Sequence, residues 1–386
     1  MAAVDPTLAR ARRLLDGFAA TARAELPAGT RLLDVHTHLG NDIDGMVGRY
    51  DELTGILATH GFEAAFMFCM DEHDREPGFQ VPNDRTLAFA EQSGGTLVPF
   101  VRLDLTADPL GEAVRCLDLG ARGIKLHPRA QKFSVGDERL GPIFALAVER
   151  EVPILIHGGR GLPPIADHLA TLVERHAGVR LIIAHAGIAD LAGLAGRLGG
   201  VPGVYFDTSV WSAVDLLDLL RQVSPEQVLY ASDYPYGRQP NSLLLTLRAA
   251  RMSGYGDAAL RLVLGESALR IVRQESQPAL TNPVGLATLS QPMTFARIHQ
   301  YLSMATPLFW LRQGDAIGAL GLAINAAQEK NGFGELTTQI HELLVTAQEL
   351  WTASRAIDDE TERNTAGRTA FSLVHLSDML AVTAHA

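Results

Sequence analysis

Short apolar runs alternate with amphipathic stretches along the first two thirds of the chain. Apolar runs typical of buried strands lie near residues 31–36, 64–69, 96–103, 121–127, 152–157, 179–185, 204–207 and 228–232. Each run is followed by residues whose apolar positions recur at helical spacing. Strands that alternate with helices in this way predict a parallel sheet in which helices connect successive strands.

The number of these units indicates which parallel sheet they form. Eight strand–helix units fall within residues 31–275, about 24–33 residues apart, and eight such units are typical of a closed (β/α)8 barrel. An open doubly wound sheet usually carries a G-x-G-x-x-G loop after its first strand. The residues after His38 lack that loop. We therefore predict an α/β fold, a (β/α)8 TIM barrel over residues 31–275.

The sequence pattern changes on both sides of the predicted barrel. Residues 1–30 contain one amphipathic helix. Residues 276–292 carry no charged side chain and are punctuated by prolines, which is typical of a linker or of an extended segment lying over the barrel. Residues 293–386 show apolar positions at helical spacing, which predicts an extra C-terminal helical region, a bundle of unknown role.

Composition narrows the classes of function. The 386 residues carry 33 basic and 44 acidic side chains, a formal net charge of -11, which disfavours a nucleic-acid partner. Two cysteines give no disulfide framework. No run approaches the ~18 apolar residues of a spanning helix, and the N-terminal helix does not read as a signal peptide. We expect a cytoplasmic protein with no membrane partner.

Titratable side chains close five of the predicted strands, where the active site of such a barrel lies. His36 and His38 are two residues apart and would point the same way on a strand. Two converging neutral imidazoles suit a divalent metal such as zinc. The sequence therefore predicts a metal site built from strand ends: His36 and His38, then Lys125, His157, His185 and Asp233.

This pattern resembles the amidohydrolase superfamily, and in particular its amidohydrolase-related (amidohydrolase 2) branch. The resemblance covers about residues 31–273 and includes the glycines that follow His157 and His185, the run Ser232-Asp233-Tyr234-Pro235, and a closing helix at 265–271. That branch contains metal-dependent hydrolases, hydratases and non-oxidative decarboxylases. The helical tail is not a usual part of the pattern.

The resemblance also implies roles for the strand-end residues. His36, His38, His157 and Asp233 would bind the metal, most simply one Zn²⁺. His185 would act as a base or polariser, and Asp233 would take a proton from the metal-activated water. Lys125 stands where a carbamylated lysine bridges two ions in some relatives, although it could equally bind a substrate carboxylate. Arg160 is the predicted substrate-binding residue, because arginine suits carboxylates.

Three functions follow from these features, in order of preference. The first is a metal-dependent hydrolase acting on a small-molecule carbonyl-type substrate. The second is a metal-dependent decarboxylase or hydratase of a small carboxylic acid. The third is a non-catalytic scaffold that works through its helical tail, which an intact ligand set disfavours. The tail could also make the protein a homo-oligomer.

Overall fold

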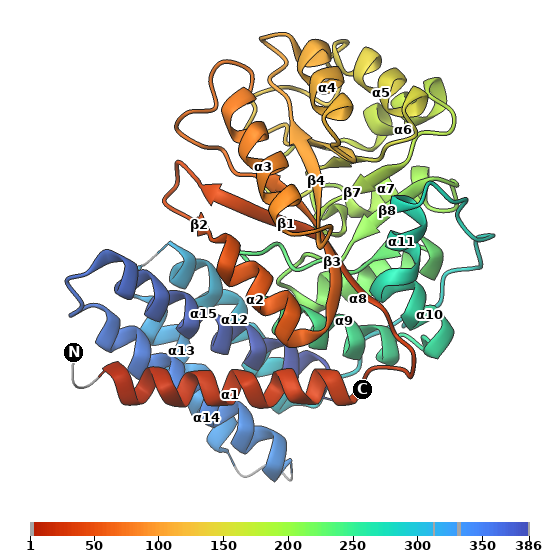
Figure 1. Ribbon diagram of the computed structural model, residues 1–386. Coiled ribbons are helices and arrows are strands. Elements are labelled where there is room, and N and C mark those ends of the chain that lie inside the picture. The colour runs from red at the N-terminus through yellow and green to blue at the C-terminus, as the bar shows by residue number, and fades with distance from the viewer. Residues whose placement is uncertain (1–3, 312, 330–332, 385–386) are drawn as a thin grey trace.

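The computed structural model describes residues 4–311, 313–329 and 333–384, and it contains the predicted barrel with helices added below it (Figure 1). Successive parallel strands lie side by side in chain order. They are β1 (Leu32–Asn41), β3 (Phe62–Cys69), β4 (Leu97–Arg102), β5 (Gly123–Leu126), β6 (Ile154–Ile156), β7 (Leu181–Ile183), β8 (Val204–Asp207) and β9 (Val228–Leu229). A short strand β2 (Val47–Gly48) pairs antiparallel with the end of β1.

The sheet closes between β1 and the segment that follows β9. The Val35 N–H donates to the Tyr230 carbonyl at 3.1 Å, and the His38 N–H donates to the Tyr234 carbonyl at 2.7 Å. Between them, the Asp233 N–H donates to the His36 carbonyl at 2.9 Å. Because these bonds join the first strand to the last, the sheet has no open edge, and the prediction of a (β/α)8 barrel is confirmed.

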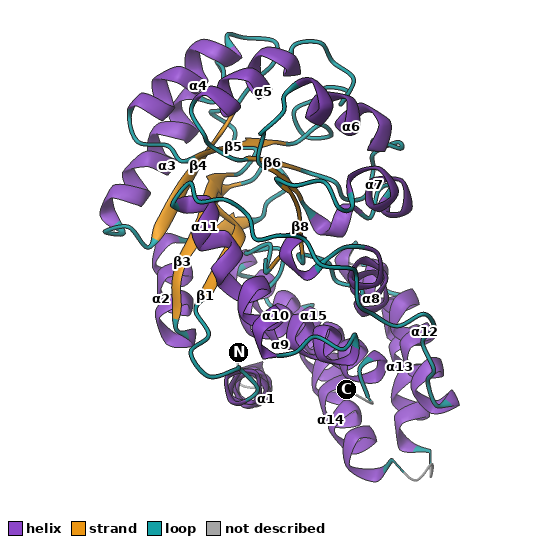
Figure 2. Ribbon diagram, turned by 90° about the vertical axis from the view of Figure 1, so that its right-hand side faces the viewer, coloured by secondary structure: helices purple, strands orange, loops and turns teal. Residues whose placement is uncertain are grey.

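Helices surround the barrel and link successive strands (Figure 2). Some begin with side-chain caps: Asp108 accepts from the Gly111 N–H before α4, and Ser212 accepts from the Asp215 N–H before α8. The connecting helices are α2 (Tyr50–His60), α3 (Gln80–Gln92), α4 (Pro109–Asp118), α5 (Leu140–Glu149), α6 (Ala166–Arg175), α7 (Leu191–Leu198) and α8 (Ala213–Gln222). Three more helices follow β9: α9 (Gln239–Met252), α10 (Asp257–Arg261) and α11 (Ser267–Val272).

Strand β1 contains a bulge that changes which residues face the barrel interior. Leu33 and Val35 pack inside the barrel with Phe66 and Phe68. Strict alternation from Val35 would then turn His36 outward. Instead, the pairing of β1 with β3 gains one extra residue on β1 between Asp34 and Thr37. The bulge resets the alternation, so His36 and His38 also face inward.

The remaining helices form a layer beside the barrel. The helix α1 (Val4–Ala24) contacts α14 (Gly334–Ser354) and α15 (Glu360–Val382), which also pack on each other (Figure 1). The helix α12 (Met293–Trp310) packs on α13 (Ala316–Gln328) and α15, and α13 also packs on α14. Residues 276–292 contain no regular element and follow the barrel surface, where Gln277 donates to the Glu226 carbonyl. No helix in the described residues is long and apolar enough to cross a membrane.

The helical layer shares one continuous apolar core with the outside of the barrel. Polar contacts also join the two. Asn241 on α9 donates to the Ser372 carbonyl at 2.9 Å, and His375 on α15 binds the Trp211 carbonyl at 2.8 Å. Within the layer itself, Arg10 on α1 pairs with Glu349 on α14. The tail is therefore held on the barrel by packing and by specific hydrogen bonds.

The contact between α12 and α15 should depend on pH. The His299 Nδ1 lies 2.7 Å from Asp378 Oδ1, and this hydrogen bond raises the pKa of His299. A histidine whose pKa is higher in the folded protein than in the unfolded chain stabilises the fold at pH values below the unfolded pKa of ~6.5. This stabilisation is lost as the pH rises through the folded pKa. We expect His299→Gln to lower thermal stability at pH 5.5, by roughly 1 kcal/mol, and to have little effect at pH 8.5.

Melting temperatures of the two proteins at both pH values test this expectation. His341→Gln on α14 is the control, because His341 contacts Gln328 rather than a carboxylate. An equal loss at both pH values would mean that the ring, and not its charge, is what stabilises the contact.

Candidate metal centre

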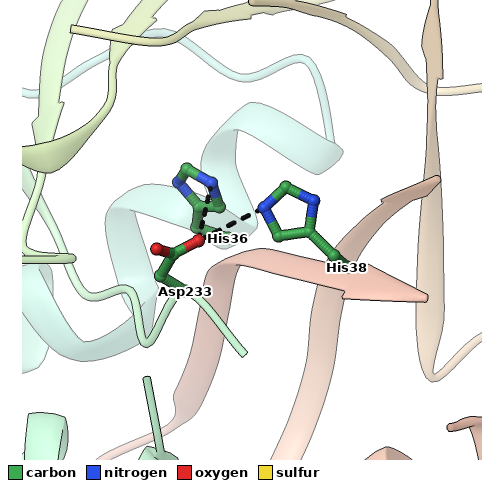
Figure 3. A group of neighbouring side chains, drawn as sticks. All are labelled: His36, His38 and Asp233. Carbon is green, nitrogen blue, oxygen red and sulfur yellow. Dashed lines mark hydrogen bonds and ion pairs between the residues drawn. The ribbon is translucent and has the colours of Figure 1, made fainter. Parts of the chain in front are cut away.

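Three of the predicted metal ligands converge at the end of β1 (Figure 3). The Asp233 Oδ1 lies 3.3 Å from His36 Nε2 and 3.2 Å from His38 Nε2. One ligand atom from each of the three residues lies within 4.8 Å of the others. The two histidines are almost fully buried, and the Asp233 side chain is 13% exposed. The arrangement presents two imidazole nitrogens and a carboxylate oxygen to one point.

The closure of the barrel positions this group. The Asp34 Oδ1 accepts hydrogen bonds from the His36 N–H at 3.1 Å and from the Ser232 N–H at 3.0 Å. One carboxylate thus satisfies the backbone at the bulge in β1 and at the segment that carries Asp233. Asp233 itself adopts a left-handed backbone conformation, with φ 60°, which costs energy in a residue other than glycine and is found at functional sites.

Asp207, at the end of β8, fixes the orientation and tautomer of His36. Its Oδ2 lies 2.7 Å from His36 Nδ1. Its Oδ1 accepts from the backbone N–H groups of His185 and Ser209, at 2.8 and 3.0 Å. Because a carboxylate can only accept, His36 carries its proton on Nδ1 and turns the Nε2 lone pair toward the centre. This carboxylate–histidine pair is the arrangement that supports a metal-binding histidine.

His185 is held in a similar way from the opposite side. Its Nδ1 lies 2.9 Å from the Ser209 carbonyl and 2.9 Å from the Ser209 hydroxyl. The carbonyl accepts, so Nδ1 carries the proton and the lone pair is on Nε2. The ring of His185 lies 4.9 Å from that of His36. His36, His185 and Asp207 form a second cluster that could hold an ion.

His157 stands slightly apart from the three convergent ligands. Its ring stacks on His127 at 3.9 Å and meets the edge of His185 at 4.8 Å. Its Nε2 is buried without a hydrogen-bond partner among the described residues. Burial, with the charges of His185 and Lys125, lowers the pKa of His157 to about 2. His157 is therefore neutral and has a free nitrogen beside the centre.

Lys125 lies at the centre of the same space. Its Nζ is 3.4 Å from His36 Nε2 and 4.7 Å from the centre of the Phe68 ring. The side chain is 1% exposed. Burial lowers the pKa of Lys125 to about 7, against the opposing charges of Asp207 and Asp233. An amine with this environment gives up its proton more readily than a surface lysine does.

The donor set fits a divalent cation. The His36 Nε2 and the Asp233 Oδ1 lie 3.3 Å apart, so a cation bound between them would be held by both atoms. Burial lowers the pKa of His36 and His38 well below the ordinary histidine value, which keeps both rings neutral. Burial also raises the pKa of Asp233 well above the ordinary value. Neutral imidazoles with a poorly compensated carboxylate are typical of metal ligands.

The predicted substrate residue is placed differently. Arg160 lies exposed on the loop after β6, and its backbone makes a hydrogen bond to His157. A second arginine, which sequence reasoning missed, is 2% exposed at the end of β4. The Nε and Nη2 of this residue, Arg102, have no partner among the described residues. Arg102 is the last residue of its strand, and this position could have identified it as a candidate site residue.

Three polar residues that support the centre were not among the predicted ligands, although the sequence allows Asp207 either to orient a ligand or to cap a helix. Asp34 accepts hydrogen bonds from two backbone N–H groups, Ser209 contacts the side chains of Asp207 and His185, and neither shows a motif of its own. Asp207 ends a predicted strand, a position equally suited to capping a helix. None of the three contributes to the point where His36, His38 and Asp233 meet, but they hold the backbone and the rings that do.

Comparisons with known proteins bear on the family and the fold of the chain. A family model described as amidohydrolase matches residues 33–274. No curated protein matches the chain significantly. Solved structures with a similar fold include a dihydroxybenzoic acid decarboxylase from a Polaromonas species, crystallised with manganese and 2-nitroresorcinol. The two chains are 13% identical, with a TM-score of 0.50, over 63% of this chain and 97% of that one.

Two other similar structures are described as enzymes of different reaction types. One is a putative 2-pyrone-4,6-dicarboxylic acid hydrolase from Pseudomonas putida, 17% identical with a TM-score of 0.48 over 64% of this chain and 98% of that one. The other is a 4-oxalomesaconate hydratase from Rhodopseudomonas palustris, 17% identical with a TM-score of 0.47 over 63% and 96%. At these identities the likeness shows the fold alone.

The hydrogen bond between Asp207 and His36 gives a direct test of the centre. Asp207→Asn keeps the size of the side chain but removes the charge that fixes His36. We expect the affinity for a divalent metal to fall about 10–100-fold, the usual effect of losing such a partner. The measurement is a competition titration with a chromophoric chelator, and circular dichroism checks the fold.

Asp218→Asn provides the matched control, because Asp218 is an exposed aspartate on α8 that pairs with Arg221. It should bind metal like the unmodified protein. Equal affinities for the Asp207 variant and the unmodified protein would show that His36 does not bind the metal through this pair.

Proposed function

Since the chain belongs to the amidohydrolase family, we propose that it is a metal-dependent enzyme that hydrolyses a small, carboxylate-bearing substrate. One observation carries the proposal: His36, His38 and Asp233 direct their ligand atoms to one buried point, and Asp207 holds His36 for that role. The fold alone would not support an enzyme, because barrels host many functions. The chemistry is in the site.

The ion would be held by His36, His38 and Asp233, with His157 as the fourth ligand. A divalent ion in this position supplies positive charge that polarises a substrate oxygen and makes water more acidic. Zinc fits the nitrogen-rich donor set, and manganese is an alternative. The number of ions depends on Lys125, because its lowered pKa favours the neutral amine that carbamylation requires.

His185 is the proposed general base. Ser209 occupies its Nδ1 as a hydrogen-bond acceptor, which leaves the Nε2 lone pair free to accept a proton. The pKa of His185 is lowered by burial, so the ring stays unprotonated at neutral pH. Asp233 offers a second carboxylate oxygen that can also receive a proton. Both groups lie at the barrel rim, where substrate reaches them.

Arg102 is the proposed group that binds the substrate carboxylate. It lies beside Lys125 on the neighbouring strand, since the two residues pair in register. Its unpartnered Nε and Nη2 form one edge of the guanidinium, and this edge suits a carboxylate in a bidentate arrangement. The Nη1 of Arg102 donates to the Cys69 carbonyl at 3.5 Å, but leaving Nε and Nη2 of a buried arginine unpaired is costly. A bound carboxylate would remove that cost.

A second candidate function is non-oxidative decarboxylation of a small carboxylic acid. The same arginine favours it, because a carboxylate bound deep in the barrel is the group that such a reaction releases. His185 or Asp233 would then carry the proton that replaces carbon dioxide on the substrate. Assays of lactones, amides and aromatic carboxylic acids, with detection of carbon dioxide, separate the two reactions.

Removal of the metal or of its ligands should abolish activity. We expect chelation, His36→Ala and Asp233→Asn each to lower kcat/KM by at least about 1,000-fold, since water activation is lost, while the fold persists. Activity after dialysis against zinc or manganese identifies the metal, and elemental analysis gives one or two ions per chain. Less than about 0.2 ion per chain after supplemented expression, or full activity in both variants, would contradict the mechanism.

Arg102 and Arg160 can be compared directly. We expect Arg102→Met to raise KM about 10–100-fold for carboxylate substrates, as expected for a lost charge-assisted pair. Amide analogues of the same substrates should lose much less. Arg160→Gln tests the exposed loop arginine under identical conditions. A larger effect at Arg160 than at Arg102 would move the carboxylate site to the loop after β6.

A further inference from the structure

A second cavity lies beside the metal centre, between the barrel rim and the C-terminal helices. Its volume is about 850 Å³. One wall consists of the loops that follow β1 and β9, residues 44–49 and 234–238. The opposite wall consists of α1, α12, α14 and α15, which lie outside the part that matches the family. The cavity therefore exists only because this chain carries its additional helices.

The lining of this cavity is strongly basic in an acidic protein. It contains twice as many arginines as carboxylates, an excess of three positive charges, whereas the whole chain has a formal net charge of -11. Charge of one sign gathered in a concave site attracts ligands of the opposite sign. The arginines are Arg12, Arg49, Arg238, Arg355, Arg363 and Arg368.

Three of these arginines come from distant parts of the chain, and two of them, Arg12 and Arg368, repel the third, Arg238. Arg12 lies on α1, Arg238 precedes α9, and Arg368 lies on α15. Burial lowers the pKa of Arg238, the charges of Glu52 and Asp16 oppose this effect, and the charges of Arg368 and Arg12 lower that pKa further. In the described residues, no ion pair joins any of the three to a carboxylate.

The packing of the tail forces these like charges together. The bonds from Asn241 to Ser372 and from His375 to Trp211 fix α15 over the rim. Arg368 itself reaches Met46 in the loop after β1, at 3.8 Å from the sulfur. Like charges held close reduce stability unless an anion lies between them. An anion bound between these arginines would relieve their repulsion.

An aromatic cluster lines the same cavity. Trp310 on α12 lies 4.8 Å from Trp211 and 5.7 Å from Phe371, measured between ring centres. Unlike most large apolar side chains of the tail, Trp310 is 37% exposed. Tyr236, whose ring is 5.6 Å from that of His38, is 6.2 Å from Trp310. The cluster offers a flat apolar surface beside the arginines.

We propose that this cavity binds a small organic anion with at least two negative charges and a flat ring, that is, an aromatic polycarboxylate. Arg12, Arg238 and Arg368 bind the charged groups, and Trp310 with its aromatic neighbours contacts the ring. This binding does not depend on the reaction proposed above, since none of His36, His38, His157, His185 and Asp233 lines the cavity.

Calorimetry with three probes tests the proposal. Benzene-1,3,5-tricarboxylate carries both the charges and the ring, propane-1,2,3-tricarboxylate carries charges alone, and benzene-1,3,5-tricarboxamide carries the ring alone. We expect the first to bind with Kd below about 1 mM, the second at least about tenfold more weakly, and the third not measurably. Arg238→Gln and Arg368→Gln should each weaken binding of the first probe about tenfold or more.

The stability of the unliganded variants separates a binding role from a structural one. Since Arg368 suffers repulsion, Arg368→Gln should melt at the same temperature as the unmodified protein or higher, whereas loss of a structural contact would lower it. Arg297→Gln on α12 is the control, because Arg297 is exposed and paired with Glu329. It should leave binding unchanged.

Several results would overturn the proposal. If neither tricarboxylate binds, or if the Arg238 and Arg368 variants bind the first probe as tightly as the unmodified protein does, the arginines do not form an anion site. Equal affinity for the two tricarboxylates would show that the aromatic cluster does not contact the ligand. Loss of binding in His36→Ala or after chelation would place the probe at the metal centre. Retained binding in His36→Ala, with activity absent, would support the cavity whatever the outcome for the proposed reaction.

Discussion

Closure of the barrel between β1 and the segment after β9 is the constraint on which the metal centre depends. The same few peptide groups complete the sheet and bring Asp233 next to the histidines, because the Asp233 N–H bonds to the His36 carbonyl. Asp34 binds both sides of this junction through one oxygen. A change that loosened the closure would therefore separate the ligands as well as open the barrel. Stability and metal binding are coupled here through backbone hydrogen bonds.

The centre is rich in groups that can accept a proton and poor in groups that can donate one. Asp207 is saturated by hydrogen bonds from His36, His185 and Ser209, so its charge is well compensated. The charge of Asp233 is not, and Lys125 is the only buried amine near it in the described residues. A cation is the simplest complement to such a site, and preorganised ligands bind it without the entropic cost of assembling them.

Much of this arrangement could be predicted from the sequence, and the remainder shows what local pattern cannot convey. The strand–helix period predicted the barrel, and strand ends predicted where the polar residues would meet. The spacing of His36 and His38 predicted a shared face, but not which face. Alternation from Leu33 and Val35 would have turned both rings outward, and only the bulge, which depends on pairing with β3, turns them inward. Asp34, Ser209 and Arg102 act through contacts between strands far apart in sequence, which a single run of residues does not reveal.

The family pattern does not explain the helical tail. The packing of the tail limits the roles that it can have. A tail used only to stabilise the barrel would bury its apolar faces and leave its charges in solvent or in ion pairs, as Arg10 does with Glu349. Arg368 instead sits near Arg12 and Arg238, over the rim, and Trp310 keeps an exposed aromatic face beside them. The grouped arginines and the exposed Trp310 both reduce the stability of the unliganded protein, since like charges repel and apolar surface stays in water. The two costs occur in one cavity that adjoins the metal centre through Tyr236, so recognition of a ligand explains them better than packing does.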